Sequence, residues 1–398
     1  MIMLSQKALN ISPSPTLAIS AKENQMKSEG IDVVGFGAGE PDFDTPEHIK
    51  EAAVKAIKEG FTKYTPAAGI PVLKESICKK LKVDNGLDYN PNQIVISNGA
   101  KHSLDNIFAS ILNPGDEVII PAPYWVSYPE MVKLNDGVPV FIETTSSSCF
   151  KVTREQLDNA WTPKTKAFIL NSPSNPTGQV YSRQELEVAA DFALKNNVFI
   201  ISDEVYEKII FGDVIHISSA SLSPEVKNLT IVVNAVSKTY SMTGWRIGYA
   251  AAPPEIAKAM GDIQSHLTSN PNSIAQKASV EAITGPQDCV EEMRQAFLKR
   301  RDYMVSRIKD MPYLDCLTPE GAFYLFVDVS DTFGKNSGTN KINDVEDFAD
   351  NLLTHSRVAL VPGTGFGAPD YVRLSFATSM ENIKKGLDRI ENFVRELK

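Results

Sequence analysis

Short apolar runs alternate with amphipathic segments along the chain from about residue 46 to residue 250. Six runs are predicted strands, and the last four of them are continuous apolar stretches without polar alternation, which is typical of strands buried on both faces of a sheet. The six runs span residues 93–97, 117–120, 166–170, 198–202, 230–234 and 247–251. This alternation predicts a large α/β domain whose mainly parallel sheet has helices on both faces.

Helices are predicted between these strands, and two of them have recognisable starts. Thr45 is the predicted cap of a helix whose first residue is Pro46. Ser182 and Glu185 have the spacing of a capping box ahead of a second helix. A third helix is predicted for residues 101–112, directly after a glycine-containing turn.

The pattern changes after about residue 285. A long charged helix at 291–309, strands at 322–329 and 357–361 and a last helix from Met380 predict a smaller α+β domain. The turn-rich segment 35–41 is predicted to join the two domains, and residues 330–340 are the best candidate for a disordered loop. The predicted boundaries are 1–15 for an N-terminal arm, 16–45 for part of the small domain and the connection, 46–284 for the large domain and 285–398 for the small domain.

Composition limits the classes of function. The 398 residues exceed the roughly 250–300 that one hydrophobic core can serve, and no run approaches the roughly 20 apolar residues that a membrane span needs. The net charge of -9, without a cluster of Lys and Arg, argues against a nucleic-acid partner. Anionic substrates must therefore be bound by a few local cations.

Cysteine and histidine patterns indicate neither a disulfide framework nor a metal site. Cys78, Cys149, Cys289 and Cys316 form no C-x-x-C pair, and the five histidines show no metal-binding spacing. The first fourteen residues hold one lysine and no sustained apolar core, so they do not resemble a signal peptide. A cytoplasmic location is predicted.

Polar residues that could bind a ligand or take part in a reaction follow the predicted strands. Asn175, Asp203 and Lys238 all lie near strand ends, where the loops of open α/β sheets converge on ligands. A single lysine is usually a solvated surface charge. In a cleft, however, loss of water and nearby cations would lower the pKa of the amine and free it for reaction with an aldehyde.

The residue types around Lys238 suit the atoms of pyridoxal phosphate. Asp203 could hold the pyridine nitrogen, and Tyr206 could reach the ring oxygen, although a helix cap and core packing are the plainer interpretations. Arg246 and Ser237 are candidate phosphate ligands. A second phosphate cradle is predicted at Ser97, Gly99 and Ala100, where a helix begins. The glycine fingerprints of nucleotide-binding loops are missing, which disfavours nucleotides.

In this order the residues resemble the pyridoxal-phosphate enzymes of fold type I, and within them the class I aminotransferases of the aspartate aminotransferase type. The resemblance covers essentially the whole chain, with one small departure at Ala235, where Gly or Ser is usual. The matching motifs are residues 37–46, 63–66, 123–125, 175–178, 237–238 with 246–248, 361–363 and 372–376.

The resemblance implies a seven-stranded, mainly parallel sheet, pyridoxal 5'-phosphate as cofactor and a role for each matching residue. Lys238 would hold the cofactor and move the substrate Cα proton, and Arg373 with Gly39 would bind the substrate α-carboxylate. Tyr64 would reach the phosphate in a neighbouring subunit, which implies a two-fold dimer with shared sites. The other implied cofactor contacts are Trp125, which stacks on the ring, Asn175 and Tyr206 on the ring oxygen, and Gly99, Ala100, Lys101, Ser237 and Arg246 around the phosphate.

The implied reaction moves an amino group between an L-amino acid and a 2-oxo acid in two half-reactions, with aspartate and glutamate the expected substrates. In the bacterial branch that the chain resembles, a lysine matching Lys101 and groups near Thr16 help to bind the distal carboxylate; a surface lysine is the competing interpretation. Some members accept prephenate with the help of a basic residue near the N-terminus, but Ser12 occupies that neighbourhood here.

Other functions remain open at this stage. An aminotransferase for aromatic amino acids or alanine, or a β-lyase or synthase, could use the same scaffold. A non-catalytic pyridoxal-phosphate-binding module is disfavoured because the chain has no basic helix-turn-helix extension. A nicotinamide dehydrogenase is disfavoured because the glycine fingerprint is missing.

Overall fold

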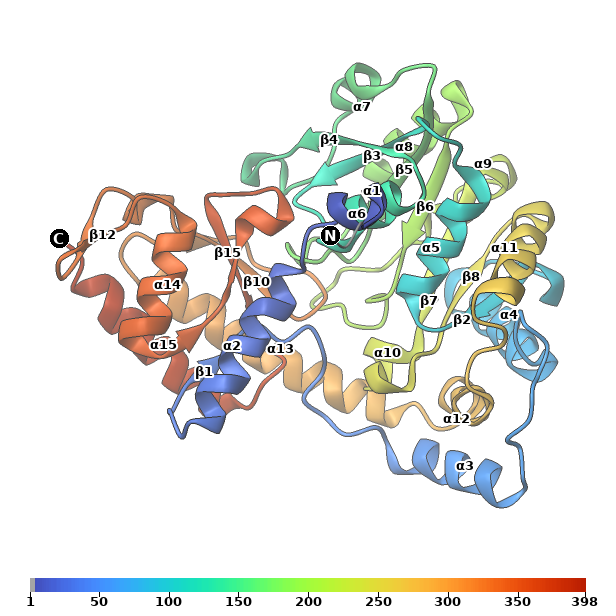
Figure 1. Ribbon diagram of the computed structural model, residues 1–398, viewed down its shortest axis with the longest axis horizontal. Coiled ribbons are helices and arrows are strands. Elements are labelled where there is room, and N and C mark those ends of the chain that lie inside the picture. Colours follow the sequence, from blue (N-terminus) through green and yellow to red (C-terminus); the bar gives the residue numbers. More distant parts are fainter. Residues whose placement is uncertain (1–3) are drawn as a thin grey trace.

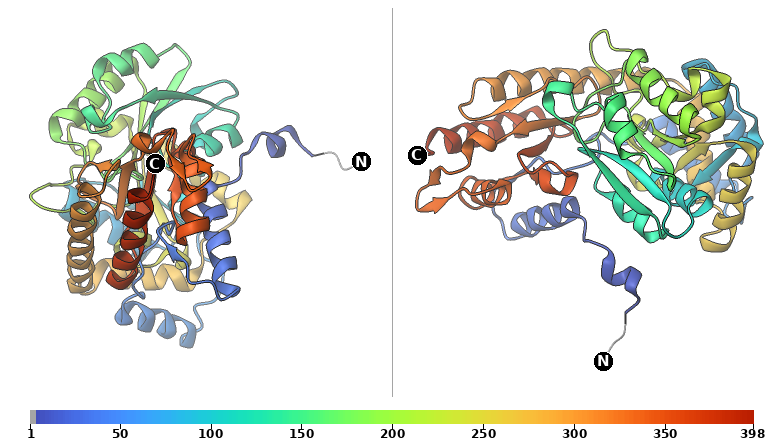
Figure 2. Two further views of the ribbon diagram at one scale, coloured as in Figure 1. Left: turned by 90° about the vertical axis from the view of Figure 1, so that its left-hand side faces the viewer. Right: turned by 90° about the horizontal axis from the view of Figure 1, so that it is seen from above.

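Two layered domains lie side by side in the computed structural model (Figure 1). The structure describes residues 4–398, so the first three residues of the predicted arm 1–15 lie outside the described residues. Helix α1 (Gln6–Asn10) lies next to α6 (Ser127–Leu134), where the Lys7 amine donates to the Leu134 carbonyl and to Asp136, both at 2.9 Å. Figure 2 shows this N-terminal segment extending from the body of the molecule.

The larger domain is built on a seven-stranded sheet, which confirms the predicted mainly parallel α/β architecture. Six of its strands are parallel and one, β8, pairs antiparallel with both of its neighbours. In spatial order the strands are β2 (Ile94–Ser97), β8 (Gly248–Ala251), β7 (Thr230–Ala235), β6 (Phe199–Asp203), β5 (Thr165–Asn171), β3 (Glu117–Ala122) and β4 (Val138–Glu143).

Helices cover both faces of this sheet because successive strand residues point to opposite sides. Val233 and Ile201 pack with α5, α6 and α11 on one face, whereas Val232 and Ile200 pack against helices of the other face. The remaining bounds are α3 (Glu47–Lys58), α4 (Pro71–Asn85), α5 (Ala100–Ile111), α7 (Arg154–Ala160), α8 (Arg183–Asn196), α9 (Pro224–Leu229), α10 (Val236–Thr239), α11 (Pro254–Leu267) and α12 (Ser273–Thr284).

One predicted helix start is confirmed and the other is wrong. Ser182 and Glu185 form the capping box of α8, with the Ser182 N–H donating to Glu185 at 2.7 Å. Helix α3 instead begins at Glu47 with Pro46 in the capping position. The Thr45 hydroxyl donates to the Ser241 carbonyl at 2.7 Å, so it ties the chain entering α3 to the loop after Lys238.

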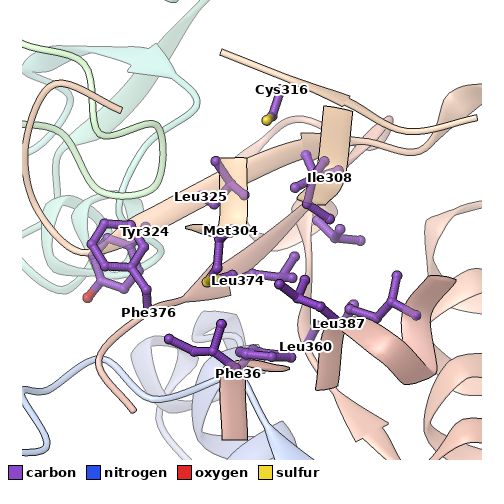
Figure 3. Packing of buried hydrophobic residues seen from close by; sticks show 14 of the residues in the cluster. Phe36, Met304, Ile308, Cys316, Tyr324, Leu325, Leu360, Leu374, Phe376 and Leu387 are labelled. Atoms are coloured by element: carbon purple, nitrogen blue, oxygen red, sulfur yellow. The ribbon is translucent and has the colours of Figure 1, made fainter. Parts of the chain in front are cut away.

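The smaller domain contains a four-stranded antiparallel sheet in the order β14-β15-β10-β9. Its core lies between this sheet and α13, α14 and α15 (Figure 3). Helix α2 contacts β13 and β14, so it packs on this domain. The bounds are α2 (Pro15–Ser28), β1 (Val34–Gly35), α13 (Asp288–Lys309), β9 (Asp315–Cys316), β10 (Tyr324–Asp328), α14 (Val345–Ser356), β13 (Val358–Ala359), β14 (Val361–Pro362), β15 (Tyr371–Ser375) and α15 (Met380–Arg395).

Two predictions for this region are wrong. The apolar run 357–361 is two short strands rather than one, because β13 pairs in parallel with β1 while β14 joins the four-stranded sheet. The run changes partner at Leu360. Residues 330–340, predicted as a disordered loop, instead contain a 3-10 turn at Ser330–Thr332 and the first strand of a hairpin, β11 (Asn336–Ser337) with β12 (Asn340–Lys341).

The connection between the domains is held by an ion pair. The Arg300 guanidinium on α13 donates to both carboxylate oxygens of Asp42, at 2.6 and 3.0 Å. Its centre also lies 5.0 Å from the centroid of the Phe43 ring. The segment that leads from β1 into the large domain is thus fixed to α13. Among residues 4–398, no helix has the length and apolar character that crossing a membrane requires.

Candidate active site

A cavity of about 540 Å³ lies at the carboxyl ends of the central strands, between the two domains. This volume is in the range of small-molecule sites. Most of the predicted site residues line it: Thr16, Gly39, Ala100, Lys101, Trp125, Asn175, Asp203, Tyr206, Ser237, Lys238, Arg246 and Arg373. Gly99 is adjacent to Ala100 at the start of α5, whereas Tyr64 is 90% exposed and does not line the cavity.

Lys238 faces this cavity from α10, the short helix that directly follows β7. Its amine donates to the Gly39 carbonyl and lies 6.0 Å from the centroid of the Tyr206 ring. Burial lowers the pKa of the amine to about 8, with the guanidinium groups of Arg373 and Arg246 acting in the same direction and Glu40 opposing them. The neutral, nucleophilic amine is therefore much more populated near neutral pH than it is for an ordinary lysine.

Asp203 is the last residue of β6 and is buried. The Tyr128 hydroxyl donates to its Oδ2 at 2.6 Å, and the Val205 N–H donates to its Oδ1 at 3.3 Å. Burial raises the pKa of the carboxyl to about 6, while these two hydrogen bonds lower it. Asp203 is thus a fixed acceptor that is ionised above about pH 6.

Tyr128 is a site residue that the sequence analysis missed. It lies three residues after Trp125, at the turn that leads into α6, where the Tyr128 N–H donates to the Trp125 carbonyl at 3.0 Å. Their rings meet edge to face with centroids 5.3 Å apart. The spacing of three residues could have suggested this pairing. Nothing in the sequence indicated that the phenol would meet Asp203, which is 75 residues away along the chain.

Tyr206 and Asn175 face the cavity near Asp203. The Tyr206 hydroxyl lies 2.9 Å from the hydroxyl of Tyr324, the first residue of β10. The Asn175 side-chain oxygen accepts a hydrogen bond from Arg373 at 3.1 Å. Polar groups of the large domain therefore contact two residues of the small domain inside the cavity, and Tyr324 is the second site residue that the sequence analysis missed.

Arg246 and the start of α5 form an anion cradle. The Arg246 guanidinium donates to the carbonyls of Thr243 and Asn98, at 2.7 and 3.2 Å. Gly99 has a φ of +86°, which favours glycine, and a Cβ atom there would lie 2.2 Å from that guanidinium and displace it. The first N–H groups of α5 have no acceptor within the helix and favour an anion at this place.

Ser97 does not belong to this cradle, contrary to the prediction. Its hydroxyl donates to the Gln264 side-chain oxygen at 2.7 Å and is buried away from the cavity. The Asn106 amide donates to the same Gln264 oxygen at 2.8 Å. Ser97 therefore fixes β2 to α11 beneath the cradle.

Arg373 brings a buried positive charge to the cavity from β15. Its guanidinium donates to the Gly37 carbonyl at 2.9 Å and to Asn175, and it lies 4.3 Å from the centroid of the Tyr324 ring. Within residues 4–398 it forms no ion pair, and its Nε has no hydrogen-bond partner. A planar cation with spare donors suits a carboxylate ligand.

Lys101 lies at the opening of the cavity with its amine 5.1 Å from the centroid of the Trp125 ring. Partial burial and the nearby Arg246 lower the pKa of this amine. Thr16, at the start of α2, lines the same cavity, and its hydroxyl lies 2.8 Å from that of Ser14. The structure thus brings both residues to one cavity, although they belong to different domains.

A second buried cluster lies outside the cavity lining and contains Glu204, Glu207 and His216 at distances that would suit a metal ion. Glu204 already accepts hydrogen bonds from Ser202 at 2.9 Å and Ser218 at 2.6 Å, and its other oxygen lies 3.2 Å from His216. Glu207 also has protein partners, so the carboxylates of both glutamates are already hydrogen-bonded or ion-paired. This arrangement indicates a structural role.

Glu207 is the centre of what we call the Glu207 network. The Lys80 ammonium pairs with it, and the Asn85 and Asn234 amides donate to it at 2.9 and 2.8 Å. Burial would raise the pKa of the Glu207 carboxyl, but Lys80, His216 and these hydrogen bonds lower it to about 2. Glu207 is therefore ionised and paired at neutral pH.

Comparison with known proteins places these observations in context. The sequence profile described as aminotransferase class I and II matches residues 31–390. An aspartate aminotransferase from Bacillus sp. strain YM-2 is 53% identical, with 99% of each chain covered. An aspartate/prephenate aminotransferase from Cereibacter sphaeroides is 48% identical, again over 99% of each. The crystal structure of an aspartate aminotransferase from Rhizobium meliloti superposes with a TM-score of 0.97, at 44% identity and over 100% of both chains.

Proposed function

The chain belongs to the class I and II aminotransferases, and from this premise we propose that it is an aspartate aminotransferase that exchanges amino groups between L-aspartate or L-glutamate and 2-oxo acids. The observation that carries the proposal is one cavity that holds the Lys238 amine, the Asp203 carboxylate and the unpaired Arg373 guanidinium. Relatives named aspartate aminotransferase match nearly the whole chain, which supports the substrate assignment.

Pyridoxal 5'-phosphate is the proposed cofactor, because the donor set of the cavity fits its groups. The cradle of Arg246 and Gly99, which a Cβ atom would fill, suits the phosphate. The ionisable carboxylate of Asp203 suits a protonated pyridine nitrogen, and the side chains of Tyr206 and Asn175 suit the ring oxygen. Bound there, the cofactor would supply an aldehyde that takes up amines and a ring that accepts electrons.

The residues of the chain would then share the work of the reaction. Lys238 would act as nucleophile toward the aldehyde and, once free, as the base that moves the substrate Cα proton, for which a pKa near 8 is suitable. Arg373 would bind and orient the α-carboxylate. Asp203, held in place by Tyr128, would keep its negative charge opposite the ring nitrogen.

The direct test is a pair of half-reactions with the purified yellow holoprotein, followed by its visible absorbance. We expect L-aspartate and L-glutamate each to convert the protein to its amine form, and oxaloacetate or 2-oxoglutarate to restore the starting spectrum. Alanine and phenylalanine should react more slowly at equal concentration. If neither acidic amino acid changed the spectrum, the assignment would be wrong.

Lys101 is the proposed partner of the distal carboxylate of aspartate. We expect Lys101→Met to lower the preference for aspartate over alanine by about 10- to 100-fold, the worth of one hydrogen bond to a charged group. Steady-state kcat/KM values for the two amino acids measure this preference. Lys133→Met, on α6 and outside the cavity lining, is the matched control. An unchanged preference in Lys101→Met would assign the lysine to the surface.

A second candidate activity is transfer to prephenate, which the name of the Cereibacter sphaeroides relative favours. Ser12, at the place where a basic residue assists some members, does not line the cavity, and its N–H donates to Glu130 at 3.0 Å. We therefore propose that aspartate with 2-oxoglutarate is a better substrate pair than any pair that includes prephenate. Including prephenate as an amino acceptor in the half-reactions decides between the two activities.

We also propose a two-fold dimer in the cytoplasm. Tyr64, which the family resemblance assigns to the neighbouring subunit's phosphate, is 90% exposed in the single chain. The segment around it is nevertheless held in place, because Gln276 binds the Ile70 N–H at 2.8 Å and the Thr65 hydroxyl at 3.2 Å. The four free cysteines agree with a reducing compartment. A sedimentation mass equal to one chain of 43.7 kDa would contradict the dimer.

A further inference from the structure

Tyr324 lies between Arg373, the proposed ligand of the substrate carboxylate, and Tyr206, which faces the proposed cofactor site. It begins β10 at the edge of the small-domain core (Figure 3), and 1% of it is exposed. One face of its ring supports the Arg373 guanidinium at 4.3 Å. Its hydroxyl lies 2.9 Å from that of Tyr206, whose ring packs edge to face with it at 5.9 Å.

The number of protons determines the direction of the bond between the two phenols. Each hydroxyl has one proton to donate and can accept in return. If Tyr206 donates its proton to the ring oxygen of the cofactor, as the proposed function requires, then Tyr324 must be the donor to Tyr206. Within residues 4–398 neither hydroxyl has another protein partner, so this bond is the support that the protein provides.

A hydroxyl that accepts a hydrogen bond is a stronger donor in turn, because chained hydrogen bonds polarise one another. The pair is buried, where this effect is largest. The charged groups that face the two phenols are Arg373, Asp203, Lys238 and Glu40, which belong to four different segments of the chain. A change confined to the Tyr324 hydroxyl leaves all four in place.

We infer that Tyr324 is a positioning residue that donates its hydroxyl proton to Tyr206 and so holds the Tyr206 proton on the ring oxygen of the cofactor, while its ring seats Arg373. This inference rests on the proposed function. It connects the carboxylate site of the small domain with the cofactor site of the large domain through one side chain. The two contributions are separable, because one belongs to the hydroxyl and the other to the ring.

The test is Tyr324→Phe, which keeps the ring and removes the hydroxyl. Its readout is the pH midpoint at which the visible absorbance of the substrate-free holoenzyme changes, a measure of the proton shared between the Lys238 nitrogen and the ring oxygen. A weaker donor leaves more negative charge on that oxygen, which holds the proton on the nitrogen more firmly. We expect the midpoint to rise by about 0.3 to 1 pH unit, with little change in KM for aspartate.

Further variants isolate the two parts of the proposal. Tyr206→Phe should raise the midpoint more, and adding Tyr324→Phe to it should cause no further rise, because the hydroxyl acts only through Tyr206. Tyr324→Leu, which also removes the ring beneath Arg373, should additionally raise KM for aspartate. Tyr371→Phe, a tyrosine on β15 outside the cavity lining, should leave the midpoint unchanged.

Two outcomes would overturn the inference. One is a midpoint in Tyr324→Phe equal to that of the wild type while Tyr206→Phe shifts it. The other is a rise in the midpoint on Tyr324→Phe that is equally large in the wild-type protein and in the Tyr206→Phe variant. Both leave the proposed function intact, whereas a wild-type protein without a pH-dependent visible band would contradict the proposed function itself. Circular dichroism and cofactor content verify that each variant is folded and loaded with cofactor. The double variant Tyr206→Phe with Tyr324→Phe tests the inference independently of the single variant.

Discussion

Replacing Lys238 with alanine is expected to lower kcat by about 10,000-fold or more, because the variant loses its nucleophile and its base together. The fold should persist, since the amine faces a cavity and its protein hydrogen bond is to the Gly39 carbonyl. Some binding of pyridoxal 5'-phosphate should persist as well, through the Arg246 cradle. Single-turnover absorbance measurements with aspartate give the loss directly.

Covalent labelling checks the same residue independently. Borohydride reduction of the wild-type holoprotein should fix the cofactor on the peptide that contains Lys238, and the variant should remain unlabelled. Lys258→Ala is the matched control, since its 78% exposed side chain pairs with Asp262 on the surface of α11. Near-normal turnover in Lys238→Ala, or a label on another lysine, would contradict the assigned role.

Replacing Lys80 with methionine is expected to destabilise the protein by about 3–5 kcal/mol, because it leaves the buried Glu207 carboxylate without its cation. The two side chains are only 10% and 5% exposed. Midpoints of urea unfolding followed by fluorescence would measure the loss. Glu207 has a folded-state pKa near 2 and an ordinary value of 4.5, so its contribution is present above about pH 4.5 and is lost as the pH falls toward 2.

A double variant distinguishes a lost charge pair from a lost contact. Lys80→Met with Glu207→Gln should be more stable than Lys80→Met alone, because no charge stays buried. The Asn85 and Asn234 amides donate to different oxygens of Glu207, so the single glutamine oxygen keeps one of these two hydrogen bonds. Lys82→Met on the same helix should change stability by less than about 1 kcal/mol, since its pair with Asp88 is exposed. Equal losses in the single and double variants would show that burial of an unpaired charge is not the cause.

Four strands of the large sheet could be predicted because they are continuous apolar runs, a pattern that is typical of strands covered on both faces. Strand β4 could not, since it lies at the edge of the sheet, contains Pro139 and buries only one of its six residues. The split of 357–361 was hidden for a different reason. Both halves are apolar, and only the three-dimensional position of β1 determines where the chain changes partner.

The candidate site shows the same division. Lys238 and Asp203 could be singled out because each follows a buried strand, and Arg373 because it lies in a family motif. Tyr128 and Tyr324 could not, because a buried tyrosine has no sequence signal that distinguishes a packing role from a polar one. Ser97 was wrongly assigned to the phosphate cradle because its hydroxyl donates to Gln264, which is 167 residues away and could not be identified from the sequence.

The direction of the Arg373 side chain depends on its exact position along strand β15. Val372 and Leu374 face the small-domain core, and Arg373 between them faces the cavity opposite Phe326 of β10. Because neighbouring side chains on a strand alternate in direction, deleting one residue ahead of Arg373 would turn its charge toward the core and an aliphatic side chain toward the ligand. The number of residues that lead into β15 is therefore as important for the placement of this charge as the arginine itself.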